Sequence, residues 1–209
     1  MYRGMLPTIL ILVGCGNDDA GPSTDRRMLV SGSDMGPLIQ NITLARGSSA
    51  VSSALVTVNG VVLNETVAGR YSGQLPAYLA VGDTLRLLVV AGADTIAATG
   101  RVPAVPTLIT PMSGATISIP TPLDFTWIDT SNPDVFRAVI QYNGVLEISS
   151  YLGSFRSGVV VTSRIPKTAT GLSAYLDAYD DGTFTGPAHP ASKMHVRQAG
   201  GRVGLVMGP

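Results

Sequence analysis

The chain has 209 residues, of which 45% are hydrophobic and 13% charged, so it can bury a core for one large or two small domains and is not a disordered chain. Its 14 Lys and Arg residues balance 14 Asp and Glu residues, which argues against a dedicated nucleic-acid-binding protein. A single cysteine excludes an intrachain disulfide, a zinc finger and an iron–sulfur cluster.

The first fifteen residues have the layout of a secretory signal. Arg3 supplies a short positive region, and residues 6–13 are mostly apolar. Because this run is shorter than the ~20 apolar residues that cross a bilayer, we interpret residues 1–14 as a signal peptide. Residues 12–15, Leu-Val-Gly-Cys, resemble a bacterial lipobox, and the resemblance implies that Cys15 receives a diacylglyceryl group and becomes the mature amino terminus. The alternative is an ordinary buried cysteine in an apolar strand.

Residues 15–27 are polar and rich in turn formers, which predicts a flexible tether behind the lipidated cysteine. Several acyl chains on Cys15 would anchor the protein to a membrane without a spanning helix. Gly16, not Asp, follows the cysteine, and in the lipoproteins that this signal resembles, this favours the outer membrane. The expected location is therefore the bacterial cell envelope, with the periplasmic and the surface face both open.

From Met28 onward the pattern indicates strands, and no window has a sustained helical period. Asn59-Gly60 and Asn143-Gly144 each lie between runs of strand-forming residues, which is the strongest short signal of a hairpin. A last hairpin is expected around Gly200-Gly201. Further expected strands cover residues 70–75, 84–90, 95–101, 123–127, 158–165, 174–179, 194–198 and 202–207. The expected fold class is all-β.

A proline-rich joint divides this body. Pro103, Pro106 and Pro111 cannot lie in a central strand, and they stiffen the chain around them. We therefore predict two tandem β-sandwiches after the signal peptide and tether, formed by residues 28–104 and 105–209, with few contacts across the joint.

Short segments of the two halves resemble known sandwich domains. Residues 122–127, Pro-Leu-Asp-Phe-Thr-Trp, resemble strand B of a fibronectin type III domain, which implies that Trp127 packs in the core. Residues 171–182 resemble strand F of that family and its turn, with Tyr175 in the tyrosine-corner position. Residues 69–73 and 81–90 resemble immunoglobulin-like or carboxypeptidase-regulatory-like domains of bacterial surface lipoproteins. These resemblances imply a fold and leave the function open, because sandwiches serve many unrelated functions.

Two histidines, His189 in a loop and His195 at the start of a strand, are the only ones in the chain. A Ser–His–Asp triad is conceivable, but the sequence holds no Gly-x-Ser-x-Gly elbow. Without an accompanying carboxylate pattern, two histidines are also weak evidence for zinc or copper. A secreted hydrolase is therefore the least supported hypothesis.

Two acidic segments, residues 129–134 and 177–182, gather oxygen donors of the kind that calcium prefers. Neither has the spacing of an EF-hand, and Asp and Asn are also the commonest turn formers. If calcium binds, we expect Asp180 and Asp181 to be its ligands.

Aromatic residues make up only 6% of the chain, so a broad carbohydrate-binding platform is not expected, although Tyr71, Tyr78 and Tyr151 could line a small one. The leading hypothesis is a lipid-anchored, non-catalytic structural or protein-interaction module that requires no cofactor. Its partners would be the membrane, through Cys15, and another envelope protein. The alternatives are a calcium- or carbohydrate-binding adhesin-type module and, in third place, the hydrolase.

Overall fold

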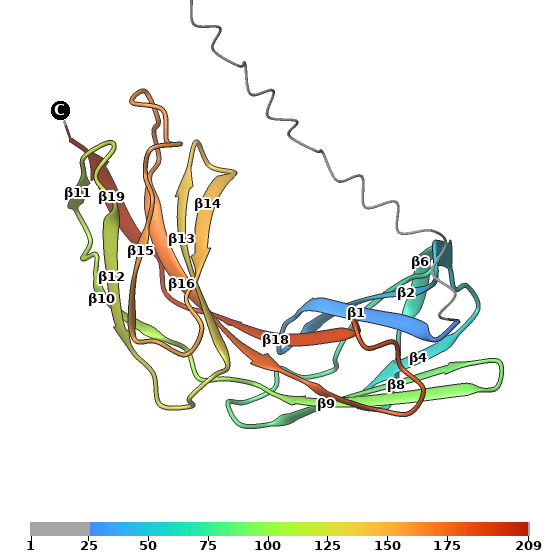
Figure 1. Cartoon of the computed structure of the whole chain (residues 1–209). Helices are drawn as coiled ribbons and strands as arrows, with labels where there is room; N and C mark the ends of the chain where they lie inside the picture. The colour runs from blue at the N-terminus through green and yellow to red at the C-terminus, as the bar shows by residue number, and fades with distance from the viewer. Residues whose placement is uncertain (1–25, 209) are drawn as a thin grey trace, which may run out of the picture.

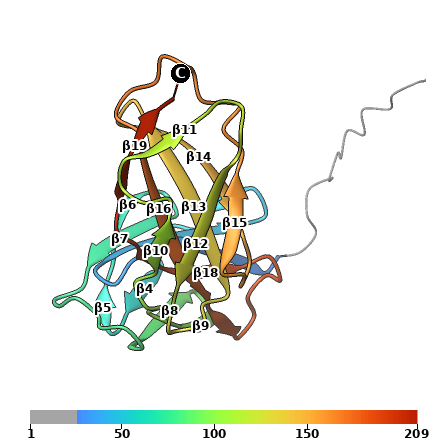
Figure 2. The same cartoon turned by 90° about the vertical axis from the view of Figure 1, so that its left-hand side faces the viewer.

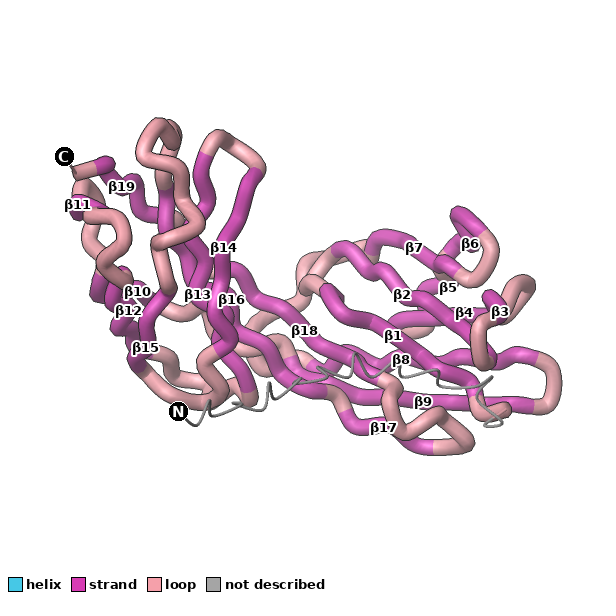
Figure 3. Tube along the Cα trace, turned by 45° about the horizontal axis from the view of Figure 1, so that its top comes forward, coloured by secondary structure: helices cyan, strands magenta, loops and turns pink. Residues whose placement is uncertain are grey.

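The computed structural model describes residues 26–208, and these form strands and loops without a helix (Figure 3). Residues 1–25, with the predicted signal peptide, Cys15 and most of the tether, lie outside the described residues. The all-β prediction is confirmed.

The strands, in chain order, are β1 (Met28–Met35), β2 (Ile39–Arg46), β3 (Ser49–Ala50), β4 (Leu55–Val58), β5 (Val61–Val62), β6 (Asn64–Val67), β7 (Arg70–Gln74), β8 (Thr84–Ala91), β9 (Asp94–Arg101), β10 (Thr107–Thr110), β11 (Ala115–Ile117), β12 (Leu123–Ile128), β13 (Val135–Tyr142), β14 (Leu146–Tyr151), β15 (Ser157–Val160), β16 (Ser173–Asp181), β17 (Thr183–Thr185), β18 (Lys193–Ala199) and β19 (Val203–Met207).

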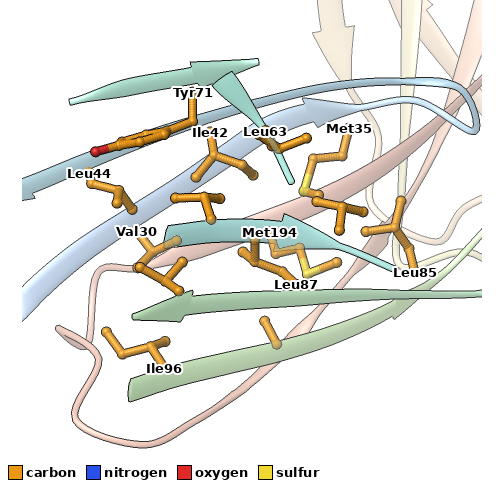
Figure 4. Close-up of a cluster of buried hydrophobic side chains, with 14 of the residues drawn as sticks. Val30, Met35, Ile42, Leu44, Leu63, Tyr71, Leu85, Leu87, Ile96 and Met194 are labelled. Carbon is orange, nitrogen blue, oxygen red and sulfur yellow. The ribbon is translucent and has the colours of Figure 1, made fainter. Parts of the chain in front are cut away.

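Two hydrophobic cores lie in two bodies that meet at an angle (Figure 1, Figure 2). The first body surrounds a core that includes Ile42, Leu87 and Ile96 (Figure 4). The second surrounds a core that includes Phe125 and Phe136. In both bodies, apolar and polar residues alternate along many strands. Because successive side chains point to opposite sides of a sheet, the apolar face of each sheet is buried in the core.

One 11-stranded sheet runs through both bodies. Its order is β11-β19-β16-β18-β1-β2-β7-β6, with β13 attached to β16, β14 attached to β13, and β3 attached to β2. A three-stranded sheet, β10-β12-β15, completes the second body, and a five-stranded sheet, β17-β9-β8-β4-β5, completes the first. Each body is thus formed by two layers of strands.

Strands β16 and β18 connect the bodies. The greater part of β16 pairs with β13 in the second body, and its end, from Asp177 to Asp181, also pairs with β18. Strand β18 then runs parallel to β1, and its Met194 and Val196 are buried in the first core. Strand β17 pairs with β9 of the first body as well.

This pairing differs from the expectation that residues 105–209 pack as a unit separate from residues 28–104. The alternation of Met194, Val196 and Gln198 with polar neighbours is compatible with any half-buried sheet position. Only the tertiary structure decides which core these side chains enter.

The expected hairpin around Gly200-Gly201 is wrong. Strands β18 and β19 do not pair with each other; β19 pairs with β11 and with the start of β16. Gly200 instead donates a backbone hydrogen bond to the carbonyl of Leu176 (2.8 Å). A Cβ at Gly200 would lie 2.5 Å from that carbonyl oxygen, so a close backbone approach explains this glycine.

The proline-rich joint is packed into the protein. Val102, Pro103, Ala104 and Pro106 are all buried, and Ala104 donates its backbone N–H to the Ser131 hydroxyl (2.7 Å). The expectation of few contacts at the joint is therefore wrong. Pro106 also lies against Gly200, the residue that follows β18, so the joint packs against the second half of the chain.

Both Asn-Gly turns are confirmed. Asn59 and Gly60 have φ values of 50° and 80°, and Asn143 and Gly144 have 51° and 78°. These left-handed conformations are the ones that Asn and Gly tolerate best. The first turn joins β4 to β5 and the second joins β13 to β14.

The predicted core position of Trp127 is also confirmed: its side chain is buried, and its ring lies 5.1 Å from that of Phe136 between centroids. The tyrosine-corner prediction for Tyr175 is wrong, because its hydroxyl donates to the carboxylate of Glu147 on β14 and not to the nearby backbone.

Candidate functional site

The two carboxylates expected to bind calcium point away from each other. Asp180 and Asp181 are neighbours on β16, so their side chains project to opposite faces of the sheet. Asp180 Oδ1 accepts the backbone N–H of Arg101 on β9 (3.0 Å). Asp181 Oδ1 forms a hydrogen bond with Nδ1 of His195 on β18. The structure therefore does not bring these two residues together into one site.

The surroundings of Asp180 also disfavour a charged state. Burial raises the pKa of the Asp180 carboxyl above its usual value, and the nearby carboxylates of Asp134 and Asp181 raise it further. In the part of the chain that the structure describes, no group of three or more His, Cys, Asp or Glu side chains is arranged to hold a metal ion.

The carboxylates of the other acidic segment accept hydrogen bonds from the protein itself. Asp129 Oδ1 accepts the backbone N–H of Ser131 (2.7 Å) and its hydroxyl (2.9 Å), and Asp134 Oδ2 accepts the backbone N–H of Asp181 (2.8 Å). The bonds of Asp129 are those by which Asp residues stabilise turns, whereas Asp134 joins its loop to the end of β16.

The predicted lipidation site, Cys15, lies outside the described residues. Between residues 26 and 208, no helix has the length and apolar character needed to span a bilayer.

A face of charged and aromatic side chains covers β14, β13, β16 and β18 on the side turned away from the second core. We call it the polar face; it consists of Arg137, Glu147, Tyr151, Tyr175, Asp177, Tyr179, His195 and Arg197. The register places Tyr151, Arg137 and Asp177 in one row across three strands, and Tyr179 opposite Arg197 in the next. The inward-pointing neighbours, such as Phe136 and Ala178, enter the second core.

Asp177 is the buried centre of this face. Its carboxylate is fully buried and lies between two guanidinium groups, 3.1 Å from Nη2 of Arg197 and 3.7 Å from Nη1 of Arg137. A buried carboxylate is tolerated when cations and hydrogen bonds compensate for the lost hydration. Since Arg137 belongs to β13 and Arg197 to β18, this one residue orients side chains from both of its neighbouring strands.

Glu147 extends the network toward the edge strand. It accepts hydrogen bonds from Arg137 Nη2 (2.8 Å) and from the Tyr175 hydroxyl. Burial opposes its ionisation, but the bonds from Tyr175 and Arg137 prevail and hold the pKa of Glu147 below its usual value. Burial and the contact with Glu147 raise the pKa of the Tyr175 hydroxyl. Glu147 is therefore a carboxylate acceptor and Tyr175 a neutral donor at physiological pH.

Three aromatic rings lie next to one another on the face; Tyr151 is exposed, His195 is half-buried and Tyr179 is buried. Tyr151 is 69% exposed, and its ring centroid lies 6.5 Å from that of Tyr179. The His195 ring meets Tyr179 edge-on at 6.3 Å between centroids. At the other end, the guanidinium group of Arg202 lies 4.6 Å above the ring of Tyr175, a cation–π distance. The arrangement can bind a ligand by ring contact and by charge-assisted hydrogen bonds.

The three tyrosines expected to line a carbohydrate platform do not lie together. Tyr71 belongs to the first core, and its hydroxyl donates to the carbonyl of Val51 and accepts from the N–H of Ala54, each at 3.0 Å. Tyr78 is exposed in the loop after β7 of the first body, whereas Tyr151 ends β14 of the second.

The two histidines have separate environments. His189 lies half-buried in the loop before β18, where its Nδ1 accepts the backbone N–H of Ala191 (3.1 Å). His195 belongs to the polar face, paired with Asp181.

Sequence reasoning missed Arg137, Glu147, Asp177, Tyr179 and Arg197 as members of one site. The available signal was the run of polar residues at every second position of residues 175–181, which is unusual for a strand whose other face is apolar. That signal identifies one strand of the face; the sequence does not reveal which strands lie beside it.

No protein-family model and no curated protein matches the chain. Among solved structures, it is similar to a chain of the fibronectin(III)-like modules of Clostridium thermocellum CbhA, with 15% sequence identity, 86% of this chain and 94% of that chain covered, and a TM-score of 0.24. The likeness is weak and says nothing about the function of this chain.

Proposed function

We propose that this chain is a lipid-anchored, non-catalytic protein of a bacterial envelope, and that it acts as a structural or protein-interaction module. The observation that carries the interaction part is the polar face, where four strands present ordered charged and aromatic side chains beside an exposed tyrosine. The lipobox resemblance at Cys15 supports the anchor.

The composition of the polar face suits a protein partner. Tyr and Arg are enriched in protein interfaces and among the residues that contribute most to binding. Here Tyr151 offers its ring to a partner, while Arg137 and Arg197 are partly exposed beside it.

The face is also ordered before binding. Asp177 and Glu147 hold Arg137 and Arg197 in place. Binding of a partner would therefore cost less conformational entropy than if two long side chains had to be fixed on binding. The connection of the two bodies through β16 and β18 supports a structural role, because hydrogen-bonded strands resist bending better than a flexible linker does.

Site-specific photocrosslinking in intact cells tests the interaction. A photoreactive phenylalanine analogue replaces Tyr151 in one variant and Tyr78 in the other; the two side chains are 69% and 64% exposed and lie in different bodies. We expect a discrete crosslinked protein from position 151 and none from position 78. Equal products from both positions, or no product from position 151, would contradict an interaction through the polar face.

Replacement of Cys15 by Ser tests the anchor. The wild-type protein should sediment with membranes in high salt, and the C15S protein should not, because the thiol is the expected acyl acceptor. If C15S still sediments with membranes, the lipoprotein proposal fails while the interaction proposal stands.

A carbohydrate-binding module is the second candidate, favoured by the exposed ring of Tyr151 and the half-buried ring of His195 beside the arginines and carboxylates of the polar face. Glycan binding that is lost in Tyr151→Ala, without a crosslinked protein from position 151, would favour this candidate. A calcium-dependent form of this module would need other ligands, because Asp180 and Asp181 project to opposite faces of the sheet and cannot bind one ion together.

A further inference from the structure

Strand β14 (Leu146–Tyr151) has a neighbour on one side only. It pairs with β13 over six residue pairs without an irregularity, and its other edge carries no strand in the part of the chain that the structure describes. Figure 1 shows β14 beyond β13, at the margin of the second body. An edge of this kind presents backbone N–H and C=O groups with which another chain can pair.

Length and sequence distinguish β14 from the other strands at sheet edges. It has six residues, whereas the others in the described part of the chain have two to four; these are β3, β5, β6, β10, β11, β15 and β17. Proteins usually protect an edge by a short strand, a bulge, Pro or Lys, and β14 has none of these. It is therefore the edge best suited to pair with an added strand.

The hydrogen bond at the end of β14 shows which backbone groups face the open edge. Leu152 donates its backbone N–H to the carbonyl of Phe136 (2.8 Å), just beyond the paired residues of β13 and β14. In an antiparallel pair, successive residues alternate between bonding to the neighbouring strand and facing away from it. Glu147, Ser149 and Tyr151 therefore direct their backbone N–H and C=O groups to the open edge.

A groove lies beside this edge, between β14 and the end of β15. Its lining includes Ile148 and Ser150 of β14, Val160 and Val161 at the end of β15, and Arg164 of the following loop. In a strand added to β14, every second side chain would point to the same side of the sheet as Ile148, and so into the groove. Apolar side chains at these alternate positions would pack against Ile148, Val160 and Val161.

The loop after β15 makes one wall of the groove positive. Residues 161–172 contain Arg164 and Lys167 and no acidic residue, and Arg164 is exposed where it lines the groove. Strand β14 contributes Glu147, but its carboxylate already accepts hydrogen bonds from two side chains of the polar face. A carboxylate on the added strand would therefore complement Arg164.

We infer that β14 binds an extended segment of another protein, which joins the sheet as a further strand and carries apolar and acidic side chains on its groove side. The inference rests on the proposed function, because the added strand would lie beside Tyr151 and extend the polar face. A second copy of the chain fits less well, since its β14 offers one carboxylate, Glu147, which its own polar face already binds. In strand addition, main-chain hydrogen bonds provide affinity and alternate side chains provide specificity.

A random peptide library displayed on phage tests the inference, with the full chain immobilised and produced without export so that no lipid is added. We expect the selected peptides to have apolar residues at alternate positions and an Asp or Glu among them. Fluorescence polarisation with the synthetic peptides then compares the wild type with two variants. Ser149→Pro removes an outward N–H without removing a bond to β13, and should weaken binding by about tenfold or more. Ser149→Ala is the matched control; it keeps the N–H and should bind like the wild type.

Two further measurements examine the backbone and the charge. N-methylation of the peptide at every second amide should abolish binding for one of the two alternating sets and spare the other, because only one set faces β14. This readout needs no variant, so it decides the question even if circular dichroism shows that Ser149→Pro does not fold. Arg164→Glu should weaken the binding of acidic peptides, whereas Arg86→Glu, at an exposed arginine of the first body, should not.

Three results would overturn the inference. The library yields no binding peptide; the selected peptides bind folded Ser149→Pro like the wild type, or show no alternation on N-methylation; or the wild type associates with itself in sedimentation equilibrium and Ser149→Pro abolishes this, which makes a second copy the occupant.

Crosslinking from position 151 separates this inference from the proposed function. A crosslinked protein that is still formed in Ser149→Pro would support an interaction through the polar face and contradict strand addition. If the wild type gives no product from position 151, the proposed interaction fails, and the peptide measurements alone decide whether β14 binds a strand.

Discussion

The buried carboxylate of Asp177 lies 3.1 Å from the guanidinium Nη2 of Arg197. Asp177 belongs to β16, which forms part of the second body, and Arg197 belongs to β18, which continues into the first core. One ion pair therefore stands at the connection between the two bodies, and the same pair organises the polar face.

Replacing Asp177 by Ala should lower the free energy of unfolding by about 3–5 kcal/mol, because it removes one partner of a buried pair and leaves two arginines without their shared carboxylate. Urea denaturation measures the change. Asp124→Ala, at an exposed carboxylate of β12, should change stability by less than about 0.5 kcal/mol. If both variants lose a similarly small free energy of unfolding, water or other side chains replace Asp177 as the partner of the two arginines, and the prediction is wrong.

Replacing Asp180 by Asn should raise the melting temperature at pH 7. The pKa of this carboxyl is raised from 3.8 in the fold, so the folded state binds the proton more tightly, and stability increases as the pH falls from the raised value toward 3.8. At pH 7 the charged form costs stability, and Asn removes this cost while its Oδ1 can still accept from Arg101. Because Asp180 is partly exposed, we expect a gain of only about 2 °C.

The pH dependence separates this cause from a packing effect. Thermal melts at pH 7 and pH 3.5 should show the gain of Asp180→Asn at the higher pH and its disappearance at the lower one, where wild-type Asp180 is itself protonated. A gain of equal size at both pH values would refute the electrostatic explanation.

Residues 28–104 should not fold alone. Without β18, the first core lacks Met194 and Val196, and β1 loses its parallel neighbour. We expect no cooperative thermal transition for this fragment, and recovery of one when it is mixed with residues 105–209. A cooperative melt of residues 28–104 by themselves would instead support the two tandem sandwiches predicted from the sequence.

Replacing Trp127 by Ala should cost about 3–5 kcal/mol, since its buried ring packs on Phe136. Replacing it by Phe should cost less than half as much. The indole N–H has no hydrogen-bond partner among the described residues, so Phe keeps most of the ring contact and leaves no polar group unpaired. Urea denaturation followed by far-ultraviolet circular dichroism compares the three proteins. Equal losses in both variants would show that the size of the indole ring, and not aromatic packing in general, is what the core requires.

Local features of the fold could be predicted because their causes are local. Asn59-Gly60 and Asn143-Gly144 adopt left-handed conformations because of their own residue types. Leu123, Phe125 and Trp127 lie on one face of their strand because they occupy alternate positions. The end of one strand depends on a distant contact: the strand expected over residues 158–165 ends at Val160, and the Thr162 hydroxyl after it donates a hydrogen bond to the carbonyl of Thr121.

Only the tertiary structure decided which strands lie side by side. The pattern of residues 194–198 predicts a half-buried strand and does not specify its neighbours. In the structure this strand, β18, lies beside β1 because Met194 and Val196 pack into the first core. The polar face follows from the same choice, because Arg137, Glu147, Asp177 and Arg197 come from four strands and meet only through their register. The sequence by itself determined the all-β class, the two tight turns and the core position of Trp127. It could not determine the shared sheet, since a strand's own residues specify its faces and not its neighbours.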